Sequence, residues 1–232
     1  MASHPAALRH HFETSEQQKD ASTIGMWLFL VTEIMFFGGM FMAYIAYRGA
    51  YPDAFGIASN NLNIFWGGLN TFVLILSSLT MAMAVHSAAL GKQRAIVVYM
   101  ILTMCLGLTF LGVKAIEYTD KFKNHEVPGH NYHFVPEKAV NEKLTPQQEA
   151  AASDQMHTQL YFGLYFGMTG LHAFHMIVGI SILLFLIPAA ARGRYNAAWH
   201  TPVEMFGLYW HFVDIVWIFL FPLLYLIDRK AS

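Results

Sequence analysis

Glu33 is a carboxyl group near the middle of an apolar run from Ile24 to Tyr47. The run is long enough to cross a bilayer as one helix, because a crossing takes about 20 residues. A carboxyl group at that depth is costly, so we expect it to be neutral, paired, or turned toward protein or water. Its position predicts a functional carboxyl group inside a membrane, with proton transfer as the chemistry that such a group offers.

Two later apolar segments carry further polar side chains at helical spacing. His172 and His175 are three residues apart, and so are His211 and Asp214, which places each pair on one face of a helix. Glu33, His172 and Asp214 each lie about 9 to 12 residues into their segments, or roughly 15 Å deep. If the helices adjoin, one polar layer forms near the middle of the membrane.

Two kinds of site could use this layer. A metal or haem would need imidazoles that converge from different helices, supplied by His172, His175 and His211 with Glu33. However, His172 and His175 share one helix, whereas a haem held by two histidines needs them on opposite sides of its ring. The alternative, which we favour, is hydrogen bonding between helices, with Asp214 paired to His211 or to another histidine. The buried polar candidates are Asn70, Glu117, His172, His175, His211 and Asp214.

The composition indicates an integral membrane protein. Hydrophobic residues make up 56% of the chain and charged residues 12%, against about 25% charged in ordinary soluble domains. The net charge of −1 comes without a basic stripe, which argues against a nucleic-acid partner. Cys105 is the only cysteine, so the chain has no internal disulfide and no paired-thiolate metal site.

The hydropathy pattern predicts an all-α fold, a polytopic bundle of five transmembrane helices. A polar N-terminal segment, 1–23, precedes a membrane domain, 24–232, in which an extended polar loop covers about 117–159. Two glycine pairs, Gly163 with Gly167 and Gly67 with Gly68, predict close helix approach. The predicted spans are about 24–47, 62–86, 95–116, 160–188 and 203–227.

Short basic loops predict the orientation of the chain. With five spans, the loop that carries Lys92 and Arg94 and the loop that carries Arg192 and Arg194 lie on the same side as the N-terminus. Because short cytoplasmic loops are enriched in lysine and arginine, we expect the N-terminus to be cytoplasmic.

Five motifs, one from each predicted span, resemble subunit III of the haem-copper oxidases. Together they follow the order of that family along all five spans, in the five-helix form that lacks the two N-terminal helices of the longer form. The extended loop at 117–159 departs from the short connection usual in the family. The motifs are Trp27 to Phe37, Leu69 to Leu74, Ala115 to Tyr118, Thr169 to Gly179 and Tyr209 to Trp217.

The resemblance implies an accessory, non-redox subunit of a respiratory terminal oxidase, which reduces O2 to water and moves protons across a bacterial inner membrane. Cytochrome c oxidase is the first expectation, and the matching subunit of a quinol oxidase or a nitric oxide reductase is the alternative. The resemblance implies no cofactor in this chain, because haem and copper belong to the partner subunits I and II. It also implies packing against subunit I, bound phospholipid, support of proton uptake and a route for O2.

The resemblance assigns roles to particular residues as well. Glu33 matches the family's glutamate that reacts with a membrane-permeant carbodiimide, a reaction that needs a protonated carboxyl group. Arg192 and Arg194 stand where the family has a basic residue near a lipid headgroup, although an ordinary cytoplasmic anchor would use the same residues.

A remote alternative is a secondary transporter with Glu33 and Asp214 as proton carriers. Such transporters often contain paired halves and broken helices, and the sequence has neither an internal repeat nor matching breaks in its spans. A third class, a membrane protein with its own haem, predicts a visible absorption band from the isolated chain.

Overall fold

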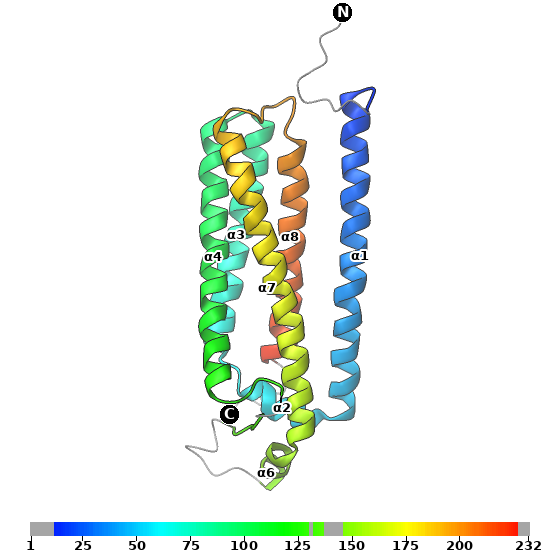
Figure 1. Cartoon of the computed structure of the whole chain (residues 1–232), viewed down its shortest axis with the longest axis vertical. Helices are drawn as coiled ribbons and strands as arrows, with labels where there is room; N and C mark the ends of the chain where they lie inside the picture. The colour runs from blue at the N-terminus through cyan, green and yellow to red at the C-terminus, as the bar shows by residue number, and fades with distance from the viewer. Residues whose placement is uncertain (1–11, 130–131, 137–145, 227–232) are drawn as a thin grey trace, which may run out of the picture.

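The computed structural model describes residues 12–129, 132–136 and 146–226, and five long helices run side by side in it (Figure 1). Each of them is long and apolar enough to cross a membrane, and no strand forms among the described residues. The predicted all-α class with five spanning helices is therefore confirmed. The long helices are α1 (Ser15–Ala50), α3 (Ile64–Ala89), α4 (Gln93–Lys123), α7 (Gln155–Ala191) and α8 (Thr201–Phe221), the last continued by the π-helical turn η1 (Pro222–Leu226).

Several helices extend beyond the apolar runs into polar sequence. α1 begins at Ser15, where the Thr14 hydroxyl accepts a hydrogen bond from the Gln17 amide and so satisfies one of the free N–H groups of the first turn. α4 continues to Lys123 and α7 begins at Gln155, so both ends of the predicted polar loop are helical.

Two short helices lie at the end of the bundle away from the N-terminus (Figure 1). α2 (Pro52–Asn60) follows α1, and α6 (Pro146–Ser153) precedes α7 and packs against α2. Within the polar loop, Gln155 holds the backbone of Phe134, because its side chain accepts from the Phe134 amide at 2.8 Å and donates to the carbonyl at 3.1 Å. The polar loop thus has structure of its own between α4 and α7.

α8 is the central helix of the bundle and α1 is the outermost. α8 packs against α1, α3 and α7, whereas α1 packs on α7 and α8 with most of its side chains exposed. In Figure 1 the blue α1 stands at one edge, separated from α3 and α4 by α7 and α8. A helix with so little protein contact presents most of its apolar surface to lipid or to another chain.

Trp210 on α8 makes close contacts with three neighbouring helices. Its indole is fully buried, and the indole Nε1 donates to the Ser77 hydroxyl of α3 at 2.9 Å. A Cβ atom on Gly179 of α7 would lie 2.7 Å from the indole, and one on Gly107 of α4 would lie 3.0 Å from it. Three helices therefore close around one aromatic ring, and two of them can do so only because they carry glycine there.

The glycine pair Gly163 and Gly167 does not play the packing role that the sequence predicts. A Cβ on Gly167 would meet no atom within 4 Å, and one on Gly163 would touch only Pro128 at 4.0 Å. The prediction was wrong for this pair because neither glycine meets a neighbouring helix, whereas the tight contact of α7 is made by Gly179 against the Trp210 ring. It is confirmed for Gly67, whose Cβ would lie 2.7 Å from the Phe221 ring.

We predict that Gly179→Ala lowers the free energy of unfolding in detergent by about 1–3 kcal/mol, because the added methyl group overpacks the contact with Trp210. Gly167→Ala in the same helix is the matched control. It should leave stability unchanged or slightly raised, since alanine favours helix and the space is open. Thermal or denaturant unfolding of both variants measures this, and equal losses would contradict the assigned role of Gly179.

Candidate functional site

Glu33 is paired with a histidine from another helix. Its Oε2 lies 3.1 Å from Nε2 of His175, so the pair connects α1 to α7. The two side chains are 20% and 11% exposed, which places the pair at the edge of the bundle, not in its core. Of the two histidines on α7, His175 is the one that meets the mid-membrane carboxyl group.

Nδ1 of His175, the ring nitrogen that faces away from Glu33, contacts its own helix. Nδ1 lies 2.9 Å from the carbonyl of Leu171, and a carbonyl can only accept, so Nδ1 carries a proton. Nε2 then either accepts from a protonated Glu33 or, as an imidazolium, donates to the carboxylate. A carboxyl group and an imidazole at this distance can share a proton, which is the chemistry that the pair offers.

His172 occupies a different environment from its neighbour. It is fully buried, and its ring packs against Phe110 at 5.3 Å and Trp217 at 5.1 Å between centroids. Neither ring nitrogen has a hydrogen-bond partner among the described residues. Three residues advance a helix by about 300°, so the two imidazoles diverge by roughly 60°, and only His175 points to α1. The predicted polar layer of Glu33, His172 and Asp214 therefore does not form as one network.

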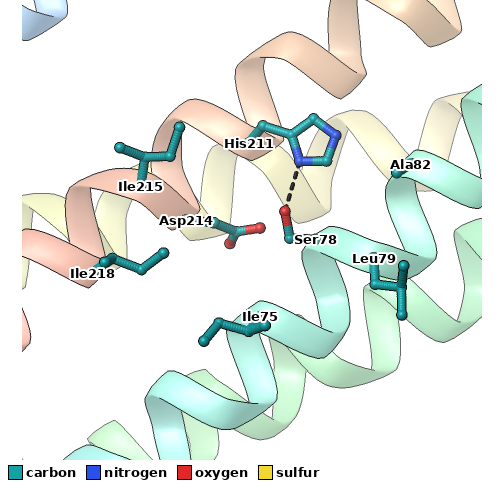
Figure 2. Close-up of a pocket in the computed structure, with 8 residues that line it drawn as sticks. All are labelled: Ile75, Ser78, Leu79, Ala82, His211, Asp214, Ile215 and Ile218. Carbon is teal, nitrogen blue, oxygen red and sulfur yellow. Dashed lines mark hydrogen bonds between the residues drawn. The ribbon is translucent and has the colours of Figure 1, made fainter.

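His211 and Asp214 line a pocket of about 330 Å³ between α3 and α8 (Figure 2). Nδ1 of His211 lies 2.7 Å from the Ser78 hydroxyl. Asp214 is only 2% exposed, and neither carboxyl oxygen makes a hydrogen bond with a described residue. The predicted pair of Asp214 with His211 is thus absent, because His211 is bonded to Ser78.

Asn70, which is fully buried in α3, likewise has both amide atoms without a partner in the described part of the chain.

Glu117 belongs to a buried ionic cluster near the end of α4. Its Oε2 lies 2.9 Å from Nζ of Lys114, and the two side chains are 7% and 4% exposed. Oε1 accepts from the Tyr165 hydroxyl at 2.8 Å and from the Tyr225 hydroxyl. The Lys114 ammonium also donates to Tyr225 at 2.7 Å and lies 4.8 Å from the centroid of the Trp217 ring. This cluster joins α4, α7, α8 and η1.

Lys114 is the polar residue that reading the sequence missed. It lies inside the predicted third span, and a lysine three residues before a glutamate on one helix was the available signal. A second buried pair follows at the end of the same helix, where Lys121 lies 2.7 Å from Glu126 and donates to the Asn61 carbonyl at 2.8 Å. The hydrogen-bond partners of the two pairs, tyrosines for the first and the Asn61 carbonyl for the second, come from distant segments. Spacing along the sequence therefore does not reveal them.

The histidines inside the spans do not gather into a metal-binding set. Among the described residues, no three side chains of histidine, cysteine, aspartate or glutamate are placed to hold one ion. His175 is bonded to Glu33, His211 to Ser78, and His172 is enclosed by aromatic rings. The chemistry that this arrangement supports is hydrogen bonding between helices, including the bond between Glu33 and His175.

Arg192 and Arg194 are exposed at the end of α7 beside Gly193, whose φ of +76° forms the turn. Neither arginine makes an ion pair with another described residue. Tyr195 follows them and is buried; its burial raises the pKa of its phenol, a rise that the Arg194 charge opposes. Both guanidinium groups are therefore accessible to an anionic group at the membrane surface.

The fold and these contacts define a polytopic membrane protein whose buried polar side chains join helices. The family model for cytochrome c oxidase subunit III matches residues 8–124 and 145–228. The chain belongs to the cytochrome c oxidase subunit III family. The two matched ranges contain all five spanning helices, and the residues between them fall in the polar loop.

Relatives in this family carry two kinds of name. The chain is 29% identical to cytochrome c oxidase subunit 3 of Thermostichus vulcanus, with 93% of this chain and 92% of that protein covered. It is 30% identical to a protein of Staphylococcus haemolyticus named "Probable quinol oxidase subunit 3", with 90% of each covered. Quinol oxidase subunit 3 of Bacillus subtilis is 26% identical over 88% of this chain and 85% of that protein.

We predict that Lys114→Met destabilises the protein by about 3–5 kcal/mol, because it leaves the Glu117 carboxylate buried without its counter-charge. The double variant Lys114→Met/Glu117→Met should recover most of this loss, since both charges are then removed together. Lys123→Met, at an exposed position of the same helix, is the control. Unfolding in detergent measures all three, and a Lys114→Met loss no larger than that of the control would refute the cluster's structural role.

Proposed function

We propose that this chain is the accessory, non-redox subunit III of a proton-pumping terminal oxidase that reduces O2 to water, with cytochrome c as its electron donor. Membership of the family across all five spans supports the proposal. The observation that supports a non-redox role is how the three histidines inside the spans are arranged. His172, His175 and His211 have separate neighbours and do not converge on one point, which supports assigning the haem and copper chemistry to partner subunits.

The Glu33–His175 pair is the part of the chain best placed to influence the oxidase. It lies at the edge of the bundle, where the outermost helix meets α7, and its carboxyl group and imidazole are close enough to share a proton. We assign it a modulating role in proton delivery or O2 access at an interface with lipid or protein. Asn70, Glu117 and Asp214 are assigned structural roles inside the bundle.

The partners that follow are oxidase subunit I, in direct contact, and subunit II with the other subunits of the complex. We place the N-terminus in the cytoplasm of a bacterium, with the helices in its plasma membrane. The basic loops at Lys92 and Arg94 and at Arg192 and Arg194 support this orientation, because both lie at the end of the bundle where α1 begins (Figure 1).

A second candidate is the matching subunit of a quinol oxidase. It is favoured by the relative from Staphylococcus haemolyticus, which is as similar to this chain as the relative named for cytochrome c oxidase. If other subunits bind the electron donor, similarity of this chain to relatives of both names does not decide between the two donors.

Affinity purification of the tagged chain from its native membrane in mild detergent tests the proposal. We expect a haem protein to co-purify and the preparation to consume O2 with reduced cytochrome c as donor. O2 consumption with quinol alone would favour the second candidate. Absence of any haem protein, or a haem band from the chain expressed by itself, would contradict the proposed function.

We further propose that Arg192 or Arg194 binds the phosphate of a phospholipid, since both side chains are exposed at the end of the spanning helix α7. The variant Arg192→Ala/Arg194→Ala should then lose phospholipid that the purified wild-type complex retains, as measured by mass spectrometry. The matched control is Lys92→Ala/Arg94→Ala, the exposed basic pair of the other loop at the same end. Equal lipid content in both variants would leave the arginines as ordinary membrane anchors.

A further inference from the structure

The core between α3, α4, α7 and α8 is arranged in three layers, each around one aromatic residue of α8 or η1. These residues, Trp210, Trp217 and Tyr225, are fully buried and follow one another at intervals of seven and eight residues, or about two helical turns. We name each layer after its aromatic residue. The Trp210 layer also contains Ser77, Gly107 and Gly179, and the Tyr225 layer contains Gly67, Lys114 and Tyr165.

The Trp217 layer lies between these two and contains the buried imidazole of His172. The ring centroids of His172 and Trp217 lie 5.1 Å apart, and the two rings pack against Phe110 at 5.3 Å and 4.9 Å. The Trp217 indole nitrogen is already occupied, because it donates to the Thr71 hydroxyl at 3.1 Å. Neither aromatic neighbour therefore offers a hydrogen bond to His172.

Asn70 reaches the same layer from α3. It lies seven residues before Ser77, which places both side chains on one face of the helix, about two turns apart. Ser77 accepts from the Trp210 indole, and Trp217 follows Trp210 by the same seven residues on the antiparallel α8. Because the next residue, Thr71, is bonded to the Trp217 indole, Asn70 lies at the depth of that ring.

Asn70 and His172 share an unusual environment. Both are fully buried, and neither the amide atoms nor the ring nitrogens have a hydrogen-bond partner among the described residues. Such groups are costly to leave unsatisfied, above all inside a membrane span. They differ from Asp214, which lines the open pocket between α3 and α8 (Figure 2). Because this chain covers them completely, neither lipid nor a partner subunit reaches them.

We propose that the Trp217 layer is a binding site for internal water, in which one or two water molecules bridge the Asn70 amide and the His172 imidazole. Water fits these ligands because an amide side chain both donates and accepts, and a neutral imidazole offers one donor and one acceptor. Buried water molecules typically make about three hydrogen bonds to groups of this kind.

The layers on either side close the site. On one side the Trp210 indole fills the space that Gly107 and Gly179 leave, and on the other Lys114 is bonded to Tyr225 at 2.7 Å. The bridging water is thus part of the folded chain and links α3 to α7 across the core. Since this chain alone encloses the site, the proposal goes beyond the proposed function and holds for either electron donor.

A structure of the full chain, purified in mild detergent with the subunits that it retains, tests the proposal at a resolution that shows ordered water. We expect a water peak at about 2.7–3.2 Å from an Asn70 amide atom. The same molecule, or one further water bonded to it, should lie at that distance from a His172 ring nitrogen. A layer without a water peak would overturn the proposal, and so would a direct bond from either side chain to a protein group.

Paired substitutions test whether the water bridges the two side chains. Asn70→Leu and His172→Phe each remove one ligand of the water and strand the other, so each should lower the free energy of unfolding in detergent. The double variant should lose clearly less than the sum of the two single losses, because the bridge can be broken only once.

The control pair is Ser77→Ala with His172→Phe. Ser77 belongs to the Trp210 layer, about 10 Å along α3 from Asn70, so these two losses should add. Additive losses for Asn70 and His172 as well would overturn the bridge. If a variant does not fold, the water peaks of the native chain still decide.

Discussion

The ion pair of Lys114 and Glu117 is the interaction on which the packing of α4, α7, α8 and η1 depends. Two charges inside a membrane span are tolerated only together, and only if their remaining hydrogen-bonding groups are filled. Tyr165 and Tyr225 fill them, and the Trp217 ring lies close to the ammonium group. Because these partners come from α7, α8 and η1, the pair is stable only when all of these elements are in place. The buried ion pair therefore favours the fold in which α4, α7, α8 and η1 are packed together.

The outer helix α1 is held differently. Among the described contacts, its polar link to the bundle in the middle of the span is the bond between Glu33 and His175. That bond lies at the edge of the molecule, where both side chains remain partly exposed. The core of the chain is thus fixed by buried charge and by aromatic packing around Trp210, while Glu33 lies on α1, the least buried of the five long helices.

The sequence predicts the fold well because membrane spans are governed by one strong requirement, about 20 apolar residues for each crossing. It also singles out Glu33 and the polar residues of the spans, since polar groups are rare there. It does not predict which groups meet. Whether His172 or His175 contacts Glu33 depends on a helix rotation of about 60°, and the close contact at Gly179 depends on a tryptophan from another helix. Lys114 could have been found from its spacing to Glu117, but its tyrosine partners could not.

The central claim is that this chain supports an oxidase without taking part in its redox chemistry. The turnover of the purified complex with Glu33→Gln tests it most directly, because Glu33 is the one mid-membrane carboxyl group joined to a proton-carrying partner at the edge of the bundle. The account predicts that haem spectra and the initial rate of O2 reduction stay close to those of the wild type, while carbodiimide labelling of the chain is lost. Loss of O2 reduction from the first turnover onward would contradict it.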